Sequence, residues 1–337
     1  MMGKTQLGRF IASSHHPIIS LFCAVMAAAL AACSRDDRAV QPAGGYAGSA
    51  ACLSCHAKRD AELVRCWQAS RHHKTLTILQ DAEQAAREFG LQRDGARKAF
   101  AVIGSACGPR VVLGRDLKLI ASLGWEDEDV FGPPHEILIG TGWRGIDAAE
   151  SCLGCHSTGY SVSRRTVLEA GIGCEACHGP GGRHVDSAAG TCETVNPVKL
   201  DLHRANMVCG QCHSRGTDKT GRYPFPVKSA ERSLEPFIPG DDLAACFTDA
   251  KPLRNGQGWE YSLLINAAER YANQRCTDCH DSHNKPGTAA MLKDPTSEQC
   301  LTCHGIGNQR LLFENHWGLG NAIEKPCWQC HKNTHSH

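Results

Sequence analysis

Seven pentapeptides of the form Cys-x-x-Cys-His recur along this chain of 337 residues and use 14 of its 20 cysteines. Two thiols at this spacing can form thioether bonds with the two vinyl groups of one haem, and the histidine that follows can bind its iron. The sequence therefore predicts seven covalently bound haem c groups. The predicted attachment residues are Cys52, Cys55, Cys152, Cys155, Cys174, Cys177, Cys209, Cys212, Cys276, Cys279, Cys300, Cys303, Cys327 and Cys330. The predicted proximal iron ligands are His56, His156, His178, His213, His280, His304 and His331.

Two other classes of site also use paired cysteines. Zinc sites need four ligands for each ion and usually occur in reducing compartments, and thioredoxin-like redox motifs need strand–helix–strand units. In this chain a histidine follows every second cysteine, an export signal precedes the first motif, and the pattern shows no repeated strand–helix–strand unit. The spacing therefore favours haem attachment.

The histidines outside the motifs bear on the second axial position of each iron. The sequence has 18 histidines, and nine remain once the proximal ligands and two in the export signal are set aside. Only Met207 and Met291 offer a thioether after that signal. We therefore expect mostly or entirely bis-histidine, low-spin haems, whose saturated irons suit electron transfer. The predicted distal ligands are His72, His135, His184, His203, His283, His316 and His335, with His73 or His337 as alternatives to His135.

Three of these distal candidates directly follow an attachment motif. His184 ends the segment CEACHGPGGRH, His283 ends CTDCHDSH and His335 ends CWQCHKNTH. We expect each of them to serve a neighbouring haem rather than its own.

Four further cysteines lie in the body of the chain outside the motifs. An even number in an oxidising compartment favours disulfides, for which three pairings are possible, and buried free thiols are the alternative. These residues are Cys66, Cys107, Cys192 and Cys246.

The N-terminus has the pattern of an export signal. Lys4 and Arg9 precede an uncharged stretch over residues 18–32, which is shorter than the roughly 20 residues of a membrane span. The stretch ends in Leu-Ala-Ala-Cys, which resembles a bacterial lipobox and predicts lipidation of Cys33. Ordinary cleavage after residues 29–31 is the alternative. We expect an exported protein, in the periplasm or at the outer membrane, anchored through this lipid.

Charge and composition limit the classes of partner and the size of the core. Without Lys4 and Arg9 the chain has 34 basic and 35 acidic residues, and no basic run suits nucleic acid. Only 42% of residues are hydrophobic and 6% aromatic, so much of the buried surface must come from porphyrin. We expect other cytochromes or redox proteins as partners, and no nucleic acid.

Several extended segments carry a family resemblance. GSAACLSCHAKRDAELVRCWQASRHH, CEACHGPGGRHV, NMVCGQCHSRG and RCTDCHDSHN resemble modules of the multihaem c-type cytochromes related to the tetrahaem cytochrome of nitrifying bacteria. The resemblance covers most of residues 46–337. It implies distal roles for His72, which follows Trp67 and Ser70, and for His184. The ending HKNTHSH and the extra Cys66 depart from the family pattern and leave the ligands near both in doubt.

The predicted fold is a mainly α and irregular multihaem cytochrome c with a haem-packed core and a small β-rich segment near residues 100–145. Helix formers dominate residues 81–100 and predict a helix there, whereas short apolar runs over 101–123 predict a small antiparallel sheet. A Pro-rich stretch after His213 predicts a long ordered loop, and residues 259–273 a helix. The expected boundaries are a lipoprotein signal at 1–32, a module with haem 1 at 33–145, haems 2–4 at 146–220, a Pro-rich connection at 221–258 and haems 5–7 at 259–337.

These features predict a seven-haem cytochrome that transfers electrons between respiratory partners in the periplasm or at the outer membrane. We expect an electron carrier without substrate turnover, either free-standing or as a subunit of a filament or an outer-membrane conduit. The alternative is a reductase of nitrite, hydroxylamine or a sulfur oxyanion, which needs one haem with an open axial position. The chain has no Cys-x-x-Cys-Lys motif and has enough histidine to saturate every iron.

Overall fold

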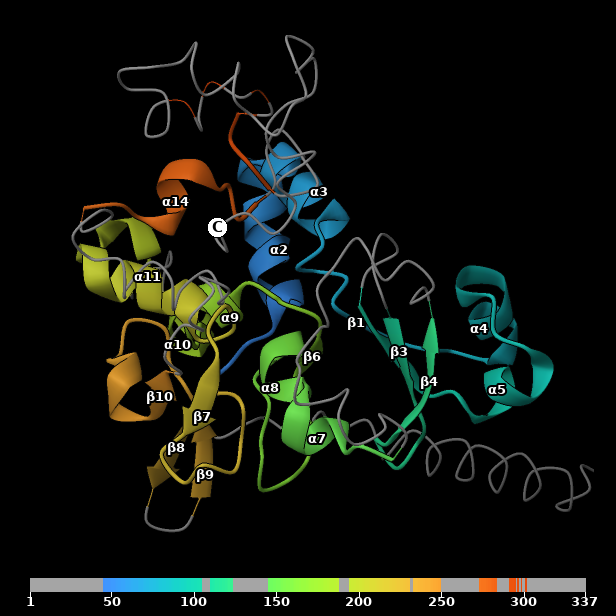
Figure 1. Ribbon diagram of the computed structural model, residues 1–337. Coiled ribbons are helices and arrows are strands. Elements are labelled where there is room, and N and C mark those ends of the chain that lie inside the picture. The colour runs from blue at the N-terminus through green and yellow to red at the C-terminus, as the bar shows by residue number, and fades with distance from the viewer. Residues whose placement is uncertain are drawn as a thin grey trace, which may run out of the picture. The chain divides into compact units, whose positions relative to one another are not determined.

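The computed structural model describes residues 45–104, 110–123, 145–187, 194–230, 233–249, 273–283 and 291–294, together with 296, 298 and 301 (Figure 1). All of them belong to one compact unit, Pro42–His337. Five of the seven motifs are described in full. In these ranges no helix is both long enough and apolar enough to cross a membrane.

Two helices at the start of the unit carry the first motif. Helix α2 spans Ser49–Arg59 and α3 spans Ala61–Ala69. The chain leaves helical geometry at Asp60, whose carboxylate accepts a hydrogen bond from the Leu63 backbone N–H and so caps α3. Buried Trp67 then donates its indole N–H to the carbonyl of Ile172 at 3.2 Å, which links α3 to the middle of the chain.

A four-stranded antiparallel sheet follows, as the apolar runs predict. Its strands pair in chain order, and the sheet begins at Leu76, earlier than the predicted β-rich segment. The early start arises because β1 pairs with β2 across the intervening helices. The strands are β1 Leu76–Ile78, β2 Ala101–Ile103, β3 Arg110–Leu113 and β4 Leu119–Leu123.

The prediction of one continuous helix over residues 81–100 is wrong. The structure has two helices, α4 Ala82–Phe89 and α5 Arg93–Lys98, separated at Gly90. Gly90 has a φ of 67°, a left-handed conformation that terminates helices and that glycine adopts without a steric penalty. Helix formers alone do not reveal this end, because one glycine within a helical pattern can also be tolerated.

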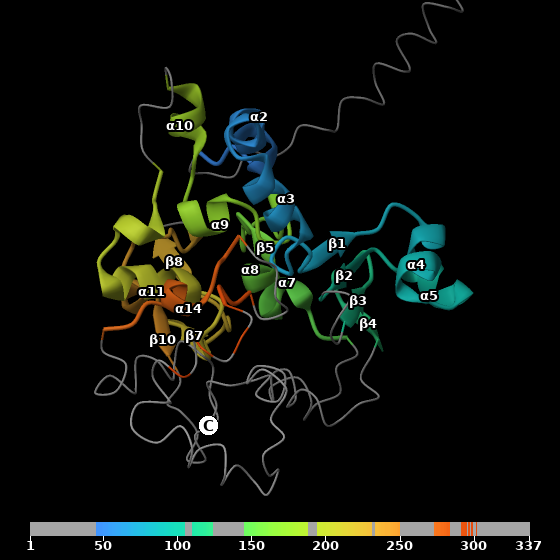
Figure 2. The same cartoon turned by 90° about the horizontal axis from the view of Figure 1, so that it is seen from above.

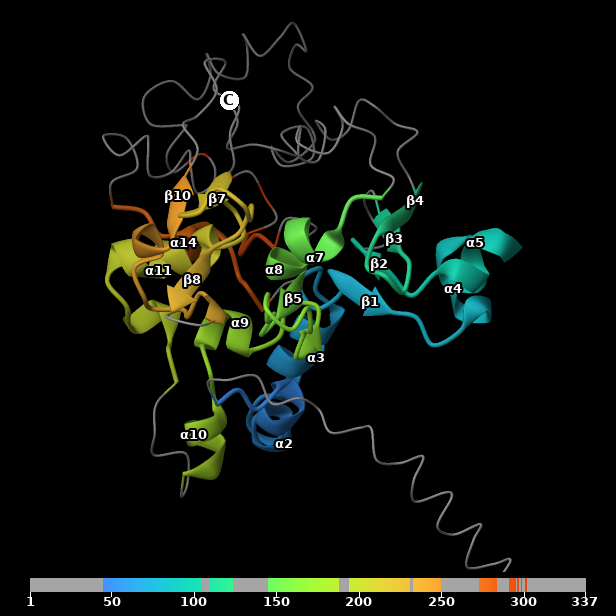
Figure 3. The same cartoon turned by 90° about the horizontal axis from the view of Figure 1, so that it is seen from below.

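Both faces of the sheet are covered, by different elements. Ala101, Ile103 and Leu113 pack toward α7 and α8, whereas Val102 and Val112 pack toward α4 and α5. This alternation is the two-residue period of a strand that is buried on both sides. Figures 2 and 3 show the sheet between the two pairs of helices.

The motif-bearing elements after the sheet are mostly short. Several are four-residue helices that coincide with an attachment motif, so they cannot be stable by themselves. These are α8 Leu153–His156, α9 Glu175–His178 and α14 Cys276–Cys279. The short helix α7 Ala148–Ser151 precedes them, and between them lie β5 Ser157–Thr158, β6 Glu169–Ala170, α10 Gly182–Asp186, the 3-10 helix η2 Pro197–Lys199 and α11 Leu202–Gly210.

The Pro-rich stretch, predicted to be a long loop, instead contributes strands and core residues. Its prolines lie where a strand tolerates them, since Pro226 precedes β8 and Pro236 ends β9. Side chains of Phe237, Leu243 and Phe247 are buried together with Met207 of α11. The elements are β7 Gly216–Asp218 paired with β10 Phe247–Asp249, the hairpin β8 Val227–Ala230 and β9 Ser233–Pro236, and the 3-10 helix η3 Leu243–Ala245.

Candidate haem-binding sites

Each described motif forms a helical turn that brings its three chemical groups together. In the second, third, fourth and fifth motifs the histidine N–H donates to the carbonyl of the first cysteine at 2.9–3.1 Å. The first motif lies within α2. Residues three and four apart share one face of a helix, so the two thiols and the imidazole project to the same side.

Three motif histidines each face a second imidazole that comes from a distant part of the chain. Ring centroids are 6.3 Å apart for His56 and His184, 6.1 Å for His213 and His72, and 6.2 Å for His178 and His283. An imidazole nitrogen binds a transition metal at about 2.0–2.1 Å and lies about 1.1 Å from its ring centre, which gives about 6.2–6.4 Å between the centres of two rings on opposite sides of one ion. The three pairs therefore fit one iron each.

Backbone carbonyls orient two of these imidazoles. Nδ1 of His178 lies 2.8 Å from the carbonyl oxygen of Val195. A carbonyl can only accept, so this nitrogen carries the proton and Nε2 is left as the metal-binding atom. The ring of His72 bonds in the same way to the backbone of Ser282.

The environment of His72 favours its neutral form. Burial lowers the pKa of His72 to about 4, and the imidazoles of His213, His280 and His283 act in the same direction. Iron binds the neutral imidazole, so this site favours the form that can act as a ligand.

Asp281 organises the segment between His280 and His283. Its Oδ1 accepts a hydrogen bond from the backbone N–H of His283 at 2.9 Å and lies 3.9 Å from Nδ1 of the same residue. The separation of 3.9 Å is too long for a hydrogen bond, so the carboxylate holds the backbone of His283 rather than its ring. The tetrapeptide 280–283 thus contains a motif histidine, a carbonyl that holds His72 and a partner of His178.

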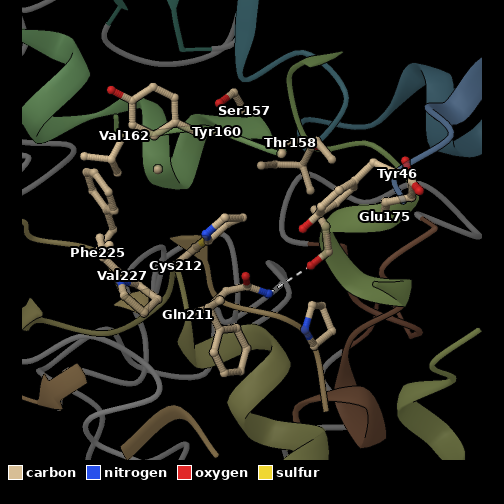
Figure 4. A pocket seen from close by; sticks show the side chains of 18 residues that line it. Tyr46, Ser157, Thr158, Tyr160, Val162, Glu175, Gln211, Cys212, Phe225 and Val227 are labelled. Carbon is tan, nitrogen blue, oxygen red and sulfur yellow. Dashed lines mark hydrogen bonds between the residues drawn. The ribbon is translucent and has the colours of Figure 1, made fainter. Parts of the chain in front are cut away.

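The attachment motifs are themselves neighbours in space. The Cys52 side chain lies within hydrogen-bonding distance of Cys174, Cys155 of Cys212, and Cys209 of Cys276. The Gln211 side chain also donates to the carbonyl of Ala176 at 2.9 Å (Figure 4). The first motif is therefore next to the third, the second next to the fourth, and the fourth next to the third and the fifth.

A cavity of about 40 Å³ lies among the second, third and fourth motifs (Figure 4). Its polar lining includes Tyr46, whose pKa is raised to about 12 by burial and by the nearby Glu175 carboxylate. Gly154 of the second motif also lines it, and a side chain there would collide with the Phe225 ring. Phe225 comes from the Pro-rich stretch, so that stretch restricts the second motif to glycine at this position.

The other candidate residues that the structure describes lie elsewhere. His203 is exposed at the start of α11, and His73 packs against the Trp67 ring at 4.3 Å, where burial lowers its pKa. Cys66 and Cys246 are buried and are not bonded to each other. Outside the described residues lie Cys33, Cys107, Cys192, residues 259–272 of the predicted helix, the cysteines and His304 of the sixth motif, the seventh motif with His331, and His135, His316, His335 and His337.

Sequence reasoning missed the groups that position the imidazoles. The carbonyls of Val195 and Ser282 carry no sequence signal, because every residue has a backbone oxygen. Glu175, between the cysteines of the third motif, is 2% exposed and accepts three backbone hydrogen bonds. A carboxylate inside an attachment motif is a signal that the sequence contains.

Two known families match separate parts of the chain. The family described as "Doubled CXXCH motif" matches residues 269–309, and "Cytochrome c554 and c-prime" matches residues 140–179. A curated relative, multiheme cytochrome MtrA of Shewanella baltica (strain OS185), is 24% identical over 204 residues. The match covers 50% of this chain and 56% of MtrA, so the chain spans little more than half the length of this relative.

Two solved cytochromes are similar in structure. The outer cell wall cytochrome OcwA superposes with a TM-score of 0.54 and 20% identity, over 77% of this chain and 67% of OcwA. An undecahaem cytochrome from the S-layer of Carboxydothermus ferrireducens gives a TM-score of 0.44 and 19% identity, over 85% and 46%. The likeness to OcwA shows a cytochrome fold with helices and small sheets.

Proposed function

We propose that this chain, a multihaem c-type cytochrome, carries seven haems and transfers electrons between redox proteins through closely spaced bis-histidine sites. Its class rests on the recurring motifs, both family matches and the MtrA relative. The proposal rests on three pairs of imidazoles. In each pair the distance between ring centroids is close to that expected for two imidazoles bound to one iron. A second imidazole on each iron leaves no position for substrate.

The pairs give a ligand assignment for three haems. His56 and His184 would hold haem 1, His178 and His283 haem 3, and His213 and His72 haem 4. Haem c, when bound, supplies an iron that gains or loses one electron. The chain would contribute two imidazoles to each site. Backbone carbonyls orient the rings of His178 and His72, and Asp281 holds the backbone of His283.

The contacts between motifs support transfer within the chain. The first and third, second and fourth, and fourth and fifth motifs meet through their cysteines. Haem edges attached at these cysteines would be neighbours, and an electron could leave the fourth site in more than one direction. The distal ligands of the remaining haems would come from His135, His203, His316 and His335.

We further propose export and attachment to a membrane through lipidated Cys33. An extracytoplasmic location is consistent with OcwA, which is an outer cell wall cytochrome. The partners would be redox proteins that present a donor or an acceptor at the surface of this chain.

Substitution of the adjacent histidines 72 and 73 tests the assignment in the haem-loaded protein. His72→Ala should keep seven haems by the pyridine haemochrome assay and convert one iron in seven to a high-spin ferric signal in electron paramagnetic resonance. His73→Ala is the matched control, because its ring packs on Trp67 and faces no described motif histidine. It should leave every iron low-spin.

The same spectra test the alternatives. A high-spin iron in the unmodified protein would favour the reductase. A high-spin signal in His73→Ala but not in His72→Ala would show that the distal ligand of haem 4 is wrongly assigned.

A further inference from the structure

The Glu175 carboxylate connects two segments that lie far apart in sequence. Its Oε1 accepts hydrogen bonds from the backbone N–H groups of Ala47 at 2.8 Å and Gly181 at 2.7 Å. Its Oε2 accepts a hydrogen bond from Gly48 at 2.7 Å. The side chain is 2% exposed, so these amides take the place of water around the carboxylate.

Each of the two segments leads directly into a helix that carries one imidazole of the His56–His184 pair. Residues 47 and 48 precede α2, which contains His56, and residue 181 precedes α10, which contains His184. Helix α10 has five residues and no buried side chain. A helix this short is not stable by itself, so the contacts at its first residues contribute to the position of His184.

Other contacts show how closely the segments approach. The Gly182 N–H donates to the carbonyl of Gly45 at 2.6 Å, and a side chain at position 182 would collide with the backbone there. Ser49 Oγ accepts a hydrogen bond from the N–H of Cys174 at 2.9 Å, beside Glu175. No ion pair to Glu175 occurs among the described residues, so backbone amides rather than a basic side chain balance its charge.

We propose that Glu175 is a positioning residue for haem 1, although it lies within the attachment motif of haem 3. By holding both segments, it keeps His56 and His184 opposite each other at 6.3 Å. The inference rests on the proposed assignment of these two histidines. It makes the axial ligation of one haem depend on a side chain in the motif of another.

Glu175→Gln in the haem-loaded protein tests this role. Glutamine keeps the size of the side chain but turns an NH₂ group toward backbone donors, so at least one of the three hydrogen bonds is lost. We expect seven attached haems and one high-spin iron in seven, which added imidazole returns to low spin. Glu175→Asp keeps the charge on a shorter side chain and should give the same high-spin signal with a smaller amplitude. It replaces the glutamine variant in this test if that variant does not accumulate.

Asp81→Asn is the matched control. Asp81 also accepts a backbone hydrogen bond, from Gln84 at 2.7 Å, but at the start of α4 and outside the motifs. A purely structural role predicts lower stability for both variants and no change of spin in either. All irons low-spin in both Glu175 variants would overturn the inference.

The double variant Glu175→Gln, His184→Ala identifies the haem concerned. If Glu175 acts through His184, the double variant shows one high-spin iron, as His184→Ala alone does, because the two changes share one target. Two high-spin irons would place the effect elsewhere and contradict the inference. Low-spin irons throughout in His184→Ala would instead refute the ligand assignment itself, which separates the two failures.

Discussion

The motif-free residues 76–123 and the motif-rich residues 145–218 are held together by different interactions. In the first region, apolar side chains alternate along the strands and fill a core on each face of the sheet. Leu113 and Leu119 are almost fully buried there. This region follows the ordinary rule that burial of aliphatic surface stabilises regular elements.

The motif-rich region relies more on side chains that bond to distant backbone. Buried Thr158 donates to the carbonyl of Gly171 and accepts from the N–H of Gly173, and Tyr160 donates to the carbonyl of Ala149. Such contacts compensate for helices of four residues that cannot support themselves. The comparison teaches that polar bonds to the backbone position a cofactor-rich segment in addition to the apolar core that it shares with the sheet.

Removal of haem should give the largest difference between the two regions. The full chain produced without haem attachment should lose slow amide exchange throughout residues 145–218. Residues 101–103 and 110–113 should keep measurable protection, because Val102 and Val112 pack on α4 and α5 without a cofactor. Hydrogen exchange followed by mass spectrometry, with the haem-loaded protein as control, measures this. Equal loss of protection in both regions would contradict the difference between them.

A cavity in the sheet should be the next largest effect. Leu113→Ala removes a side chain that is 0% exposed and should lower the free energy of unfolding by about 2–5 kcal/mol, measured by urea denaturation. The spin state of every iron should stay unchanged, since this core includes the attachment residues Cys152 and Cys155 but no motif histidine. Ile78→Ala, at a side chain that is 39% exposed, is the control and should cost about 0.5 kcal/mol or less. A high-spin signal in Leu113→Ala would contradict the separation of core and ligands.

A smaller, pH-dependent effect is expected at the turn after β7. Burial raises the pKa of Asp218, but hydrogen bonds from the Thr220 hydroxyl and from the N–H groups of Tyr223, Thr220 and Arg222 outweigh it and hold the pKa below its usual value. Asp218→Asn should therefore cost about 1–3 kcal/mol at neutral pH.

The sign of the pH dependence follows from the lowered pKa. The ionised carboxylate stabilises the fold above the unfolded pKa of about 3.9, and this contribution is lost as the pH falls through the folded value. Urea titrations of both proteins from pH 7 to 3 should show the difference shrinking only below about pH 4. A difference that is constant across this range would show that the charge of Asp218 is not involved.

Local chemistry made several features predictable. The sheet over residues 101–123 follows from short apolar runs, and its strands are confirmed. The end of α4 at Gly90 was not predicted, because a lone glycine can either end a helix or be tolerated within it. The strands among the prolines were not predicted, because they depend on which segment pairs with which. A proline at the end of a strand and a proline in a loop look the same until the pairing of Val227 with Pro236 is known.

The sequence by itself determined the chemistry of attachment, because thioether formation depends on the spacing of two cysteines and a histidine within one turn of chain. It also limited the candidate distal ligands to a short set of histidines. Only the tertiary structure decided which imidazole faces which motif, since His72 and His213 or His56 and His184 meet only after folding. Long-range pairing of this kind is set by the packing of distant segments, and no local pattern encodes it.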